Sequence, residues 1–188
     1  MSRGTVAKVS AEPTVLEERQ LIGRFVSPGS VAETRAELRQ GNRAHALPPA
    51  AAPTPAASGD WVVVRALCRV RRHEDREDDI LKVCEVLQLE PFDSTPLVVR
   101  QVESGGATLR FLTPIEVEPR PVHDMYALDF PPLDIMASGE TRAEAEAAFL
   151  DELAWLWETY AQADATTLAE DAAELRATLP GMVQKGAS

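Results

Sequence analysis

The chain has 188 residues and carries 30 Asp and Glu against 19 Lys and Arg, which gives a formal net charge of −11 at pH 7. No run of about 18 apolar residues occurs, so the sequence predicts no membrane-spanning helix. The first residues, Met1 to Thr5, lack the apolar run of a secretory signal, and we therefore expect a cytoplasmic protein.

The negative charge is concentrated in the later part of the chain. Residues 1–60 have seven Lys and Arg against six Asp and Glu, whereas residues 61–188 have 12 against 24. Residues 139–179 alone contain ten acids and two arginines, Arg142 and Arg176. Such a surface repels phosphates, so nucleic acid is not the expected partner of this region. It either maintains solubility or forms a face that binds a basic partner.

A change in composition near residue 60 predicts the domain organisation. Residues 45–60 are rich in Pro and Ala and show no hydrophobic periodicity, which predicts a disordered linker. The linker separates an N-terminal arm, residues 1–44, from one folded domain, residues 61–188.

The arm has few large apolar side chains and cannot form a domain by itself. A capping-box pattern predicts one short helix over Val31–Gln40, ended by Gly41, and residues 13–26 predict another helix or a strand. Three interpretations of residues 1–44 remain open. The arm is a segment that folds on contact with a partner, a small DNA-binding element, or translated sequence upstream of the true start.

The first half of the domain has the pattern of short strands rich in β-branched and apolar residues. Gly105 and Gly106 provide the positive φ of a tight hairpin turn. Alternation in the second strand puts five residues on one face: Leu81, Val83, Glu85, Leu87 and Leu89. The predicted strands are Trp61–Val70, Ile80–Leu89, Leu97–Val102, Thr108–Leu112 continued by Ile115–Val117, and Met125–Phe130.

The junction after the last strand predicts the start of a long helix. The Thr141 side chain can accept from the N–H of Glu144, and the Glu144 carboxylate can accept from the N–H of Thr141, which makes a capping box. Gly139 lets the chain turn sharply before the cap, and Glu140 and Ala145 complete the motif. An apolar stripe predicts that this helix packs on the sheet: Ala145, Phe149, Leu153, Leu156 and Tyr160.

A second, short helix completes the predicted fold. It begins with a capping box at Thr167 and Glu170 and ends at Pro180 and Gly181. We therefore expect an α+β fold: a small antiparallel sheet of four or five strands, covered on one face by a long C-terminal helix and a short second helix. A disordered N-terminal arm precedes it.

The residues give little indication of catalysis and no expected cofactor. Cys68 and Cys84 are interpreted as small buried apolar groups, with a metal pair or a disulfide as the alternative. Asp129, Asp134 and Glu140 cluster near the strand-to-helix junction. The favoured interpretation is that these acids are turn and cap residues that face water. The alternative function is a small hydrolase or metal-dependent nuclease that uses these three acids. Three histidines lack the spacing of metal ligands: His45, His73 and His123.

Two groups of surface residues are candidates for binding. The long helix carries a predicted partner-binding set made of Asp151, Glu152, Trp157 and Glu158, with Trp155 and Tyr160 expected in the core. A basic group on one strand face indicates a nucleic-acid-binding module as the alternative: Arg65, Arg69 and Arg71.

One stretch resembles the HicB-like antitoxin family. Met125-Tyr126-Ala127-Leu128-Asp129-Phe130-Pro131 leads to a short return strand and then to Gly139-Glu140-Thr141-x-x-Glu144-Ala145. In that family a small sheet ends in a Gly-Asp/Glu-Thr-x-x-Glu-Ala turn that starts the packing helix. The resemblance covers about residues 122–162. This chain departs from the family at Pro131-Pro132-Leu133, in its short region after Leu179 and in its N-terminal arm.

The resemblance implies a partly formed ribonuclease-H-like sheet and helix without enzymatic activity. It implies the antitoxin of a type II toxin–antitoxin pair, which neutralises a small basic RNA-cleaving toxin. A protein partner such as this toxin is therefore expected, together with self-association through an exposed sheet edge.

Overall fold

The structure is a computed structural model that describes residues 13–27, 35–48, 56–73, 75–161 and 170–185. The fold is α+β, as expected. The chain forms two compact units, unit 1 from Met1 to Phe92 and unit 2 from Asp93 to Ser188. We expected the division near residue 60. It lies at Phe92 instead, because strands before residue 60 pair with strands that follow it.

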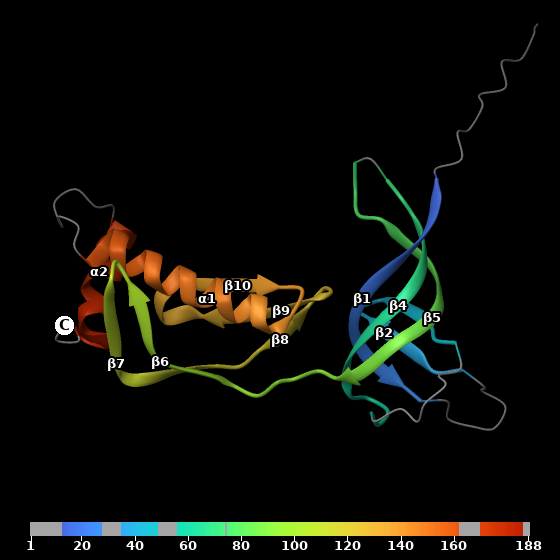
Figure 1. The fold of residues 1–188 in the computed structure, drawn as a ribbon, viewed down its shortest axis with the longest axis horizontal. Helices are drawn as coiled ribbons and strands as arrows, with labels where there is room; N and C mark the ends of the chain where they lie inside the picture. Colours follow the sequence, from blue (N-terminus) through green and yellow to red (C-terminus); the bar gives the residue numbers. More distant parts are fainter. Residues whose placement is uncertain (1–12, 28–34, 49–55, 74, 162–169, 186–188) are drawn as a thin grey trace, which may run out of the picture. The chain divides into compact units, whose positions relative to one another are not determined.

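Unit 1 contains one curled antiparallel sheet (Figure 1). In the order β3-β2-β1-β4-β5, its strands are β3 (Arg43–Ala46), β2 (Glu37–Gln40), β1 (Thr14–Val26), β4 (Trp61–Arg71) and β5 (Asp79–Pro91). Strands β1 and β4 pair along their length, from Thr14 opposite Arg71 to Arg24 opposite Trp61. Part of the predicted arm is therefore a central strand of this sheet.

The predicted helix over Val31–Gln40 is not formed at its C-terminal end. Residues 37–40 are β2, and Gly41, with φ of 54°, is in the hairpin turn to β3 instead of ending a helix. Leu38 is fully buried in the sheet core, which accounts for the strand. The capping-box residues Ser30 and Glu33 lie outside the described residues.

The core of unit 1 combines residues from before and after residue 60. The free Cys68 is buried in it, as expected, and the free Cys84 is half-buried. The core residues are Leu21, Phe25, Leu38, Leu47, Val62, Val64, Ala66, Cys68, Val70 and Val83. Removing these side chains from water is the main favourable contribution to the free energy of folding of unit 1. It amounts to about 1.5–3 kcal/mol for each large side chain.

Strand β5 does not alternate as predicted. Its pairing with β4 shifts at three places. After each shift a β5 residue has been skipped, so that Val86 pairs with Ala66, Val83 with Cys68 and Ile80 with Val70. Each shift is a β-bulge that adds one β5 residue and bends the strand. The side chains packed on the core therefore recur every third residue: Ile80, Val83, Val86 and Leu89. Leu81 and Leu87, expected on the same face as Val83, are instead 43% and 46% exposed.

Unit 2 has two three-stranded sheets (Figure 1). One has the order β10-β9-β8, made of β10 (Ile135–Gly139), β9 (Met125–Phe130) and β8 (Arg120–Val122). The other has the order β11-β7-β6, made of β11 (Val183–Lys185), β7 (Ala107–Val117) and β6 (Leu97–Ser104). Gly105 and Gly106, with φ of 57° and 77°, form the predicted hairpin turn between β6 and β7.

Helix α1 (Arg142–Leu156) packs against strands of both sheets. Its predicted stripe is buried at Ala145, Phe149, Leu153 and Leu156, and the Phe149 ring meets Phe130 edge-on at 6.4 Å. A second stripe packs against Val102, Leu109 and Val183, and consists of Leu150, Ala154 and Trp157. The helix continues as a π-helix, η2 (Trp157–Ala161).

The C-terminal helix α2 (Glu170–Met182) includes Pro180 and Gly181. The helix therefore ends at Met182, one residue after the predicted end at Pro180 and Gly181. Thr167, predicted to cap it, lies outside the described residues. A 3-10 turn (Pro131–Leu133) joins β9 to β10. Within the described ranges, no helix is both long enough and apolar enough to cross a membrane.

Candidate functional site

The start of α1 is organised as the sequence predicts. The Thr141 hydroxyl accepts from the Glu144 N–H at 3.2 Å, and the Glu144 carboxylate accepts from the Thr141 N–H at 3.1 Å. Gly139 serves a different purpose from the predicted one, since its φ is not positive. A Cβ at this position would lie 2.5 Å from the Ala145 nitrogen and 2.6 Å from the Glu144 Cβ. Only glycine therefore lets β10 approach the helix so closely.

Arg142 connects the helix start to the beginning of unit 2. Its Nη1 lies 2.5 Å from the Asp93 carboxylate, and its Nε donates to Glu146 at 2.7 Å. The hydrogen bond to Glu146, followed by the negative charge of Asp93, raises the pKa of Arg142. Hydrogen bonds from Thr95, with a smaller contribution from Arg142, lower the pKa of Asp93. These contacts hold Arg142 between Asp93 and Glu146 at the start of α1.

The three acids of the hydrolase alternative are not grouped as metal ligands in this structure. Asp129 is paired with Arg120 at 2.5 Å. Asp134 ends the 3-10 turn in the left-handed region, and Glu140 follows the far end of β10. Because Met136 pairs with Asp129, Glu140 lies about four strand residues, or roughly 13 Å, from Asp129. Among the described residues, no three His, Cys, Asp or Glu side chains are grouped as metal ligands.

The predicted partner-binding residues divide into two groups. Asp151 and Glu152 are exposed on α1, as that prediction requires. Glu158 is also exposed, but its carboxylate lies 3.1 Å from the Ser104 hydroxyl at the β6–β7 turn. Trp157 is half-buried against the apolar cluster of β6, β7 and β11, and is thus a packing residue.

Trp155 takes the exposed position that we expected of Trp157. It is 49% exposed and meets the Tyr160 ring edge-on at 5.7 Å. The prediction that placed Trp155 in the core was therefore wrong. The physical reason is that the sheet of β6, β7 and β11 covers the side of α1 that contains Trp157. Trp155 lies four residues after Asp151 and three after Glu152, so helical spacing brings all three to neighbouring surface positions. We call these three residues the acidic aromatic patch.

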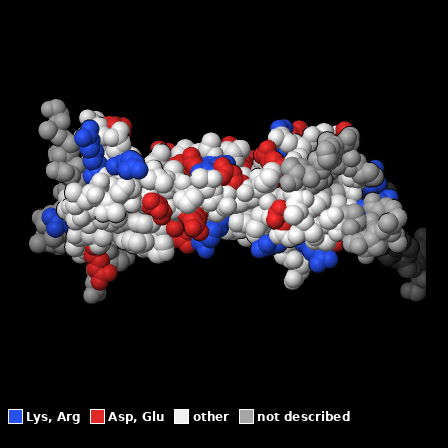
Figure 2. Space-filling model, turned by 90° about the horizontal axis from the view of Figure 1, so that it is seen from below, with Lys and Arg blue, Asp and Glu red and all other residues white. Residues whose placement is uncertain are grey.

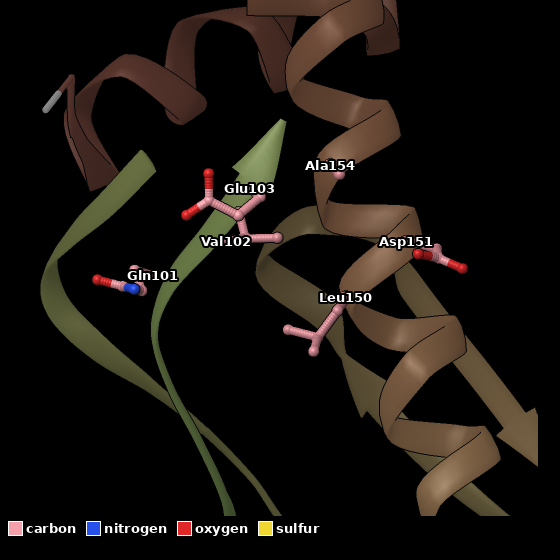
Figure 3. A pocket seen from close by; sticks show the side chains of 6 residues that line it. All are labelled: Gln101, Val102, Glu103, Leu150, Asp151 and Ala154. Atoms are coloured by element: carbon pink, nitrogen blue, oxygen red, sulfur yellow. The ribbon is translucent and has the colours of Figure 1, made fainter. Parts of the chain in front are cut away.

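A groove lies beside this patch, between β6 and α1 (Figure 3). Its volume is about 340 Å3. Val102 and Leu150 point toward each other across it, whereas Glu103 and Asp151 point away on opposite sides. Gln101 and Ala154 complete the lining. Leu150 falls outside the main apolar stripe of the helix, which is an indication of the groove in the sequence itself.

The arginines of the nucleic-acid alternative are exposed on β4 of unit 1. The Arg65 guanidinium is paired with the Glu18 carboxylate. Arg69 lies directly opposite Lys82 of β5, and Arg71 follows two residues later on the same face. Like charges directly opposite each other in a sheet destabilise it. Arg69 and Lys82 are therefore two neighbouring cations on a surface of mixed charge.

The net charge belongs entirely to unit 2. Residues 1–92 have 13 Lys and Arg and 13 Asp and Glu, whereas residues 93–188 have six and 17. On the face drawn in Figure 2, acidic and basic side chains form separate small groups and not one continuous field. Binding by charge therefore depends on local patches.

The residues of the family motif occupy successive elements of unit 2. Tyr126 to Phe130 lie in β9, Gly139 ends β10, and Thr141 with Glu144 caps α1. Comparisons with models of known protein families, with curated proteins and with solved structures found no match.

Proposed function

We propose that unit 2 is a non-enzymatic protein-binding module that binds a basic protein through the acidic aromatic patch of α1. The observation that carries this proposal is Trp155, a large side chain left 49% exposed one helical turn after Asp151 and Glu152. Tryptophan is enriched among the residues that contribute most of the binding energy at protein interfaces. The HicB-like resemblance suggests the class of partner, a small basic RNA-cleaving toxin.

The chemistry of the patch fits a partner rich in Lys and Arg. The Trp155 ring offers apolar contact and a face for a cation. Asp151 and Glu152 supply negative charge at exposed positions, where it accelerates association more than it increases affinity. The net charge of residues 93–188 adds long-range attraction, which salt weakens. We therefore expect binding that is fast at low salt and weaker at high salt.

The test uses a tagged full chain in a pull-down from the native cell, together with any small basic protein of about 60–80 residues encoded beside its gene. The variant Asp151→Lys/Glu152→Lys reverses the patch. The control Glu116→Lys/Glu118→Lys makes the same change in net charge on exposed residues of β7 and the loop that follows it. Loss of the partner with the first variant alone supports the proposal. Equal loss, or no loss, with both variants contradicts it.

A second candidate function is supported by one observation in unit 1. Arg69 of β4 lies directly opposite Lys82 of β5, and an anion bound between them would relieve the repulsion of this like-charge pair. This arrangement favours nucleic-acid phosphates, with Arg71 as a further contact. The test is single-stranded DNA binding at several salt concentrations. Arg69→Gln should weaken binding, whereas Arg65→Gln, whose arginine is held by Glu18, should have less effect.

A further inference from the structure

The groove between β6 and α1 runs along the open edge of a strand. Gln101, Val102 and Glu103 are consecutive in β6, and all three line it. Side chains of consecutive strand residues point to opposite faces of the sheet. A single groove can therefore contact all three residues only if it runs along the backbone at the edge of the strand. In the described part of the chain, β6 pairs with β7 alone and ends its sheet.

The hairpin turn determines which backbone groups face the groove. Gly105 and Gly106 form a two-residue turn, so Ser104 and Ala107 form a hydrogen-bonded pair. Hydrogen-bonded and non-bonded pairs alternate along an antiparallel ladder. The pairs that follow toward the N-terminus of β6 are Glu103 with Thr108, Val102 with Leu109, and Gln101 with Arg110. Gln101 and Glu103 therefore direct their N–H and C=O groups to the open edge.

The lining of the groove combines an apolar floor with acidic borders (Figure 3). Val102 is buried, and Leu150 and Ala154 are half-buried, so their remaining exposed surface faces the groove. Glu103 and Asp151 flank the floor from β6 and from α1. An added strand next to β6 would place alternate side chains over Leu150 and Ala154. Its other side chains would lie on the opposite face of the sheet, beside the Glu103 carboxylate.

We propose that β6 accepts one further β-strand from a basic protein partner, with apolar residues toward α1 and Lys or Arg residues on the opposite face, beside Glu103. Strand addition satisfies the open backbone groups of Gln101 and Glu103 and covers the groove. The inference rests on the proposed function, because it names how the same partner engages the chain. A second copy of β6 fits less well, since pairing brings two copies of the Glu103 carboxylate together.

The experiment measures binding of the full chain to a fluorescent synthetic peptide of about eight alternating lysine and valine residues. Two further peptides carry N-methyl groups on alternate amides, one set on each edge of the extended peptide. A fourth peptide has glutamate in place of lysine. Strand addition requires that one N-methylated peptide bind as well as the parent and that the other bind about tenfold or more weakly. The glutamate peptide should not bind.

Two alanine variants of α1 test the groove directly. Ala154→Met fills the groove and should weaken binding of the parent peptide about tenfold. Ala148→Met is the matched control, because Ala148 is also half-buried on α1 but does not line the groove. It should leave binding unchanged. Thermal unfolding of both variants shows that they are folded.

The outcomes separate this inference from the proposed function. If both N-methylated peptides bind as the parent does, and Asp151→Lys/Glu152→Lys abolishes binding, the partner binds through charge without strand addition. That result overturns the inference and leaves the proposed function standing. If no peptide binds while the partner still depends on Asp151 and Glu152, the inference is again overturned. The chain could also form a dimer that the parent peptide does not dissociate. That result would assign the edge of β6 to a second copy of the chain and overturn the inference.

Discussion

The Nη1 atom of Arg142 lies 2.5 Å from the Asp93 carboxylate, so the first residue of α1 is tied to the first residue of unit 2. A cation at a helix N-terminus is unfavourable to the helix dipole. Asp93 and Glu146 offset this effect by placing two carboxylates on the same guanidinium. The Arg142 side chain is only 23% exposed, which strengthens both contacts relative to surface ion pairs.

The lowered pKa of Asp93 predicts a pH dependence of stability. Its usual value is 3.8, and the folded chain holds it lower, chiefly through hydrogen bonds from Thr95. The ionised carboxylate therefore stabilises the fold fully above pH 3.8, and this contribution is lost as pH falls through the lower folded value. The size should be less than about 1 kcal/mol, because Asp93 is largely exposed.

The free energy of unfolding is measured by urea titration at about ten pH values between pH 2 and pH 7. Asp93→Asn should flatten the acid part of the profile relative to the unchanged chain. Asp134→Asn is the control, because Asp134 is an exposed turn residue. A profile unchanged by Asp93→Asn, or changed equally by both substitutions, would contradict this account.

Gly139 is predicted to be far more sensitive to substitution than Gly181. In Gly139→Ala the new Cβ meets backbone atoms of Glu144 and Ala145 below 3 Å, so β10 and α1 must separate. We expect a loss of about 2–3 kcal/mol in the free energy of unfolding. Gly181→Ala in α2 is the matched control, since nothing lies within 4 Å of its new Cβ. It should be neutral or stabilising, because alanine favours a helix.

The residues around Gly139 show how far the sequence could predict this fold. The capping box of Thr141 and Glu144 is local, so spacing alone was sufficient to find it. The pairing of Thr14 with Arg71 joins segments that lie far apart in the chain, and no local pattern specifies it. The exchange of roles between Trp155 and Trp157 has the same cause, because β6, β7 and β11 determine which tryptophan is covered.

The two tryptophans of α1 should therefore respond differently to truncation. Trp157→Ala removes contacts to the cluster of Val102, Leu109 and Val183, and should lower the free energy of unfolding by about 2–3 kcal/mol. Trp155→Ala should lower it by less than about 1 kcal/mol, because the ring is half-exposed. Chemical unfolding measures both values. If Trp155→Ala were the more destabilising change, the assignment of the acidic aromatic patch would fail.

Strand β5 offers a similar contrast between two residues that simple alternation places on one face. Val83 is 3% exposed and Leu87 is 46% exposed, because the bulges change the side-chain period. Val83→Ser should destabilise unit 1 by about 2–3 kcal/mol through lost burial and a buried hydroxyl. Leu87→Ser should change stability by less than about 0.5 kcal/mol. Equal effects of the two substitutions in thermal unfolding would favour an unbulged strand.

The boundary between the two units predicts how fragments of the chain behave. A fragment of residues 93–188 keeps every described element of unit 2, and should unfold cooperatively and bind the same partner as the full chain.

A fragment of residues 61–188 retains β4 and β5 but lacks β1, which exposes Val62, Val64 and Ala66 of the unit 1 core. We expect this longer fragment to bind a dye specific for exposed apolar surface and to aggregate, because an unpaired apolar strand invites association. Dye fluorescence and sedimentation of both fragments, with the full chain as control, decide the matter. A soluble longer fragment without dye binding would show that β4 and β5 do not depend on β1.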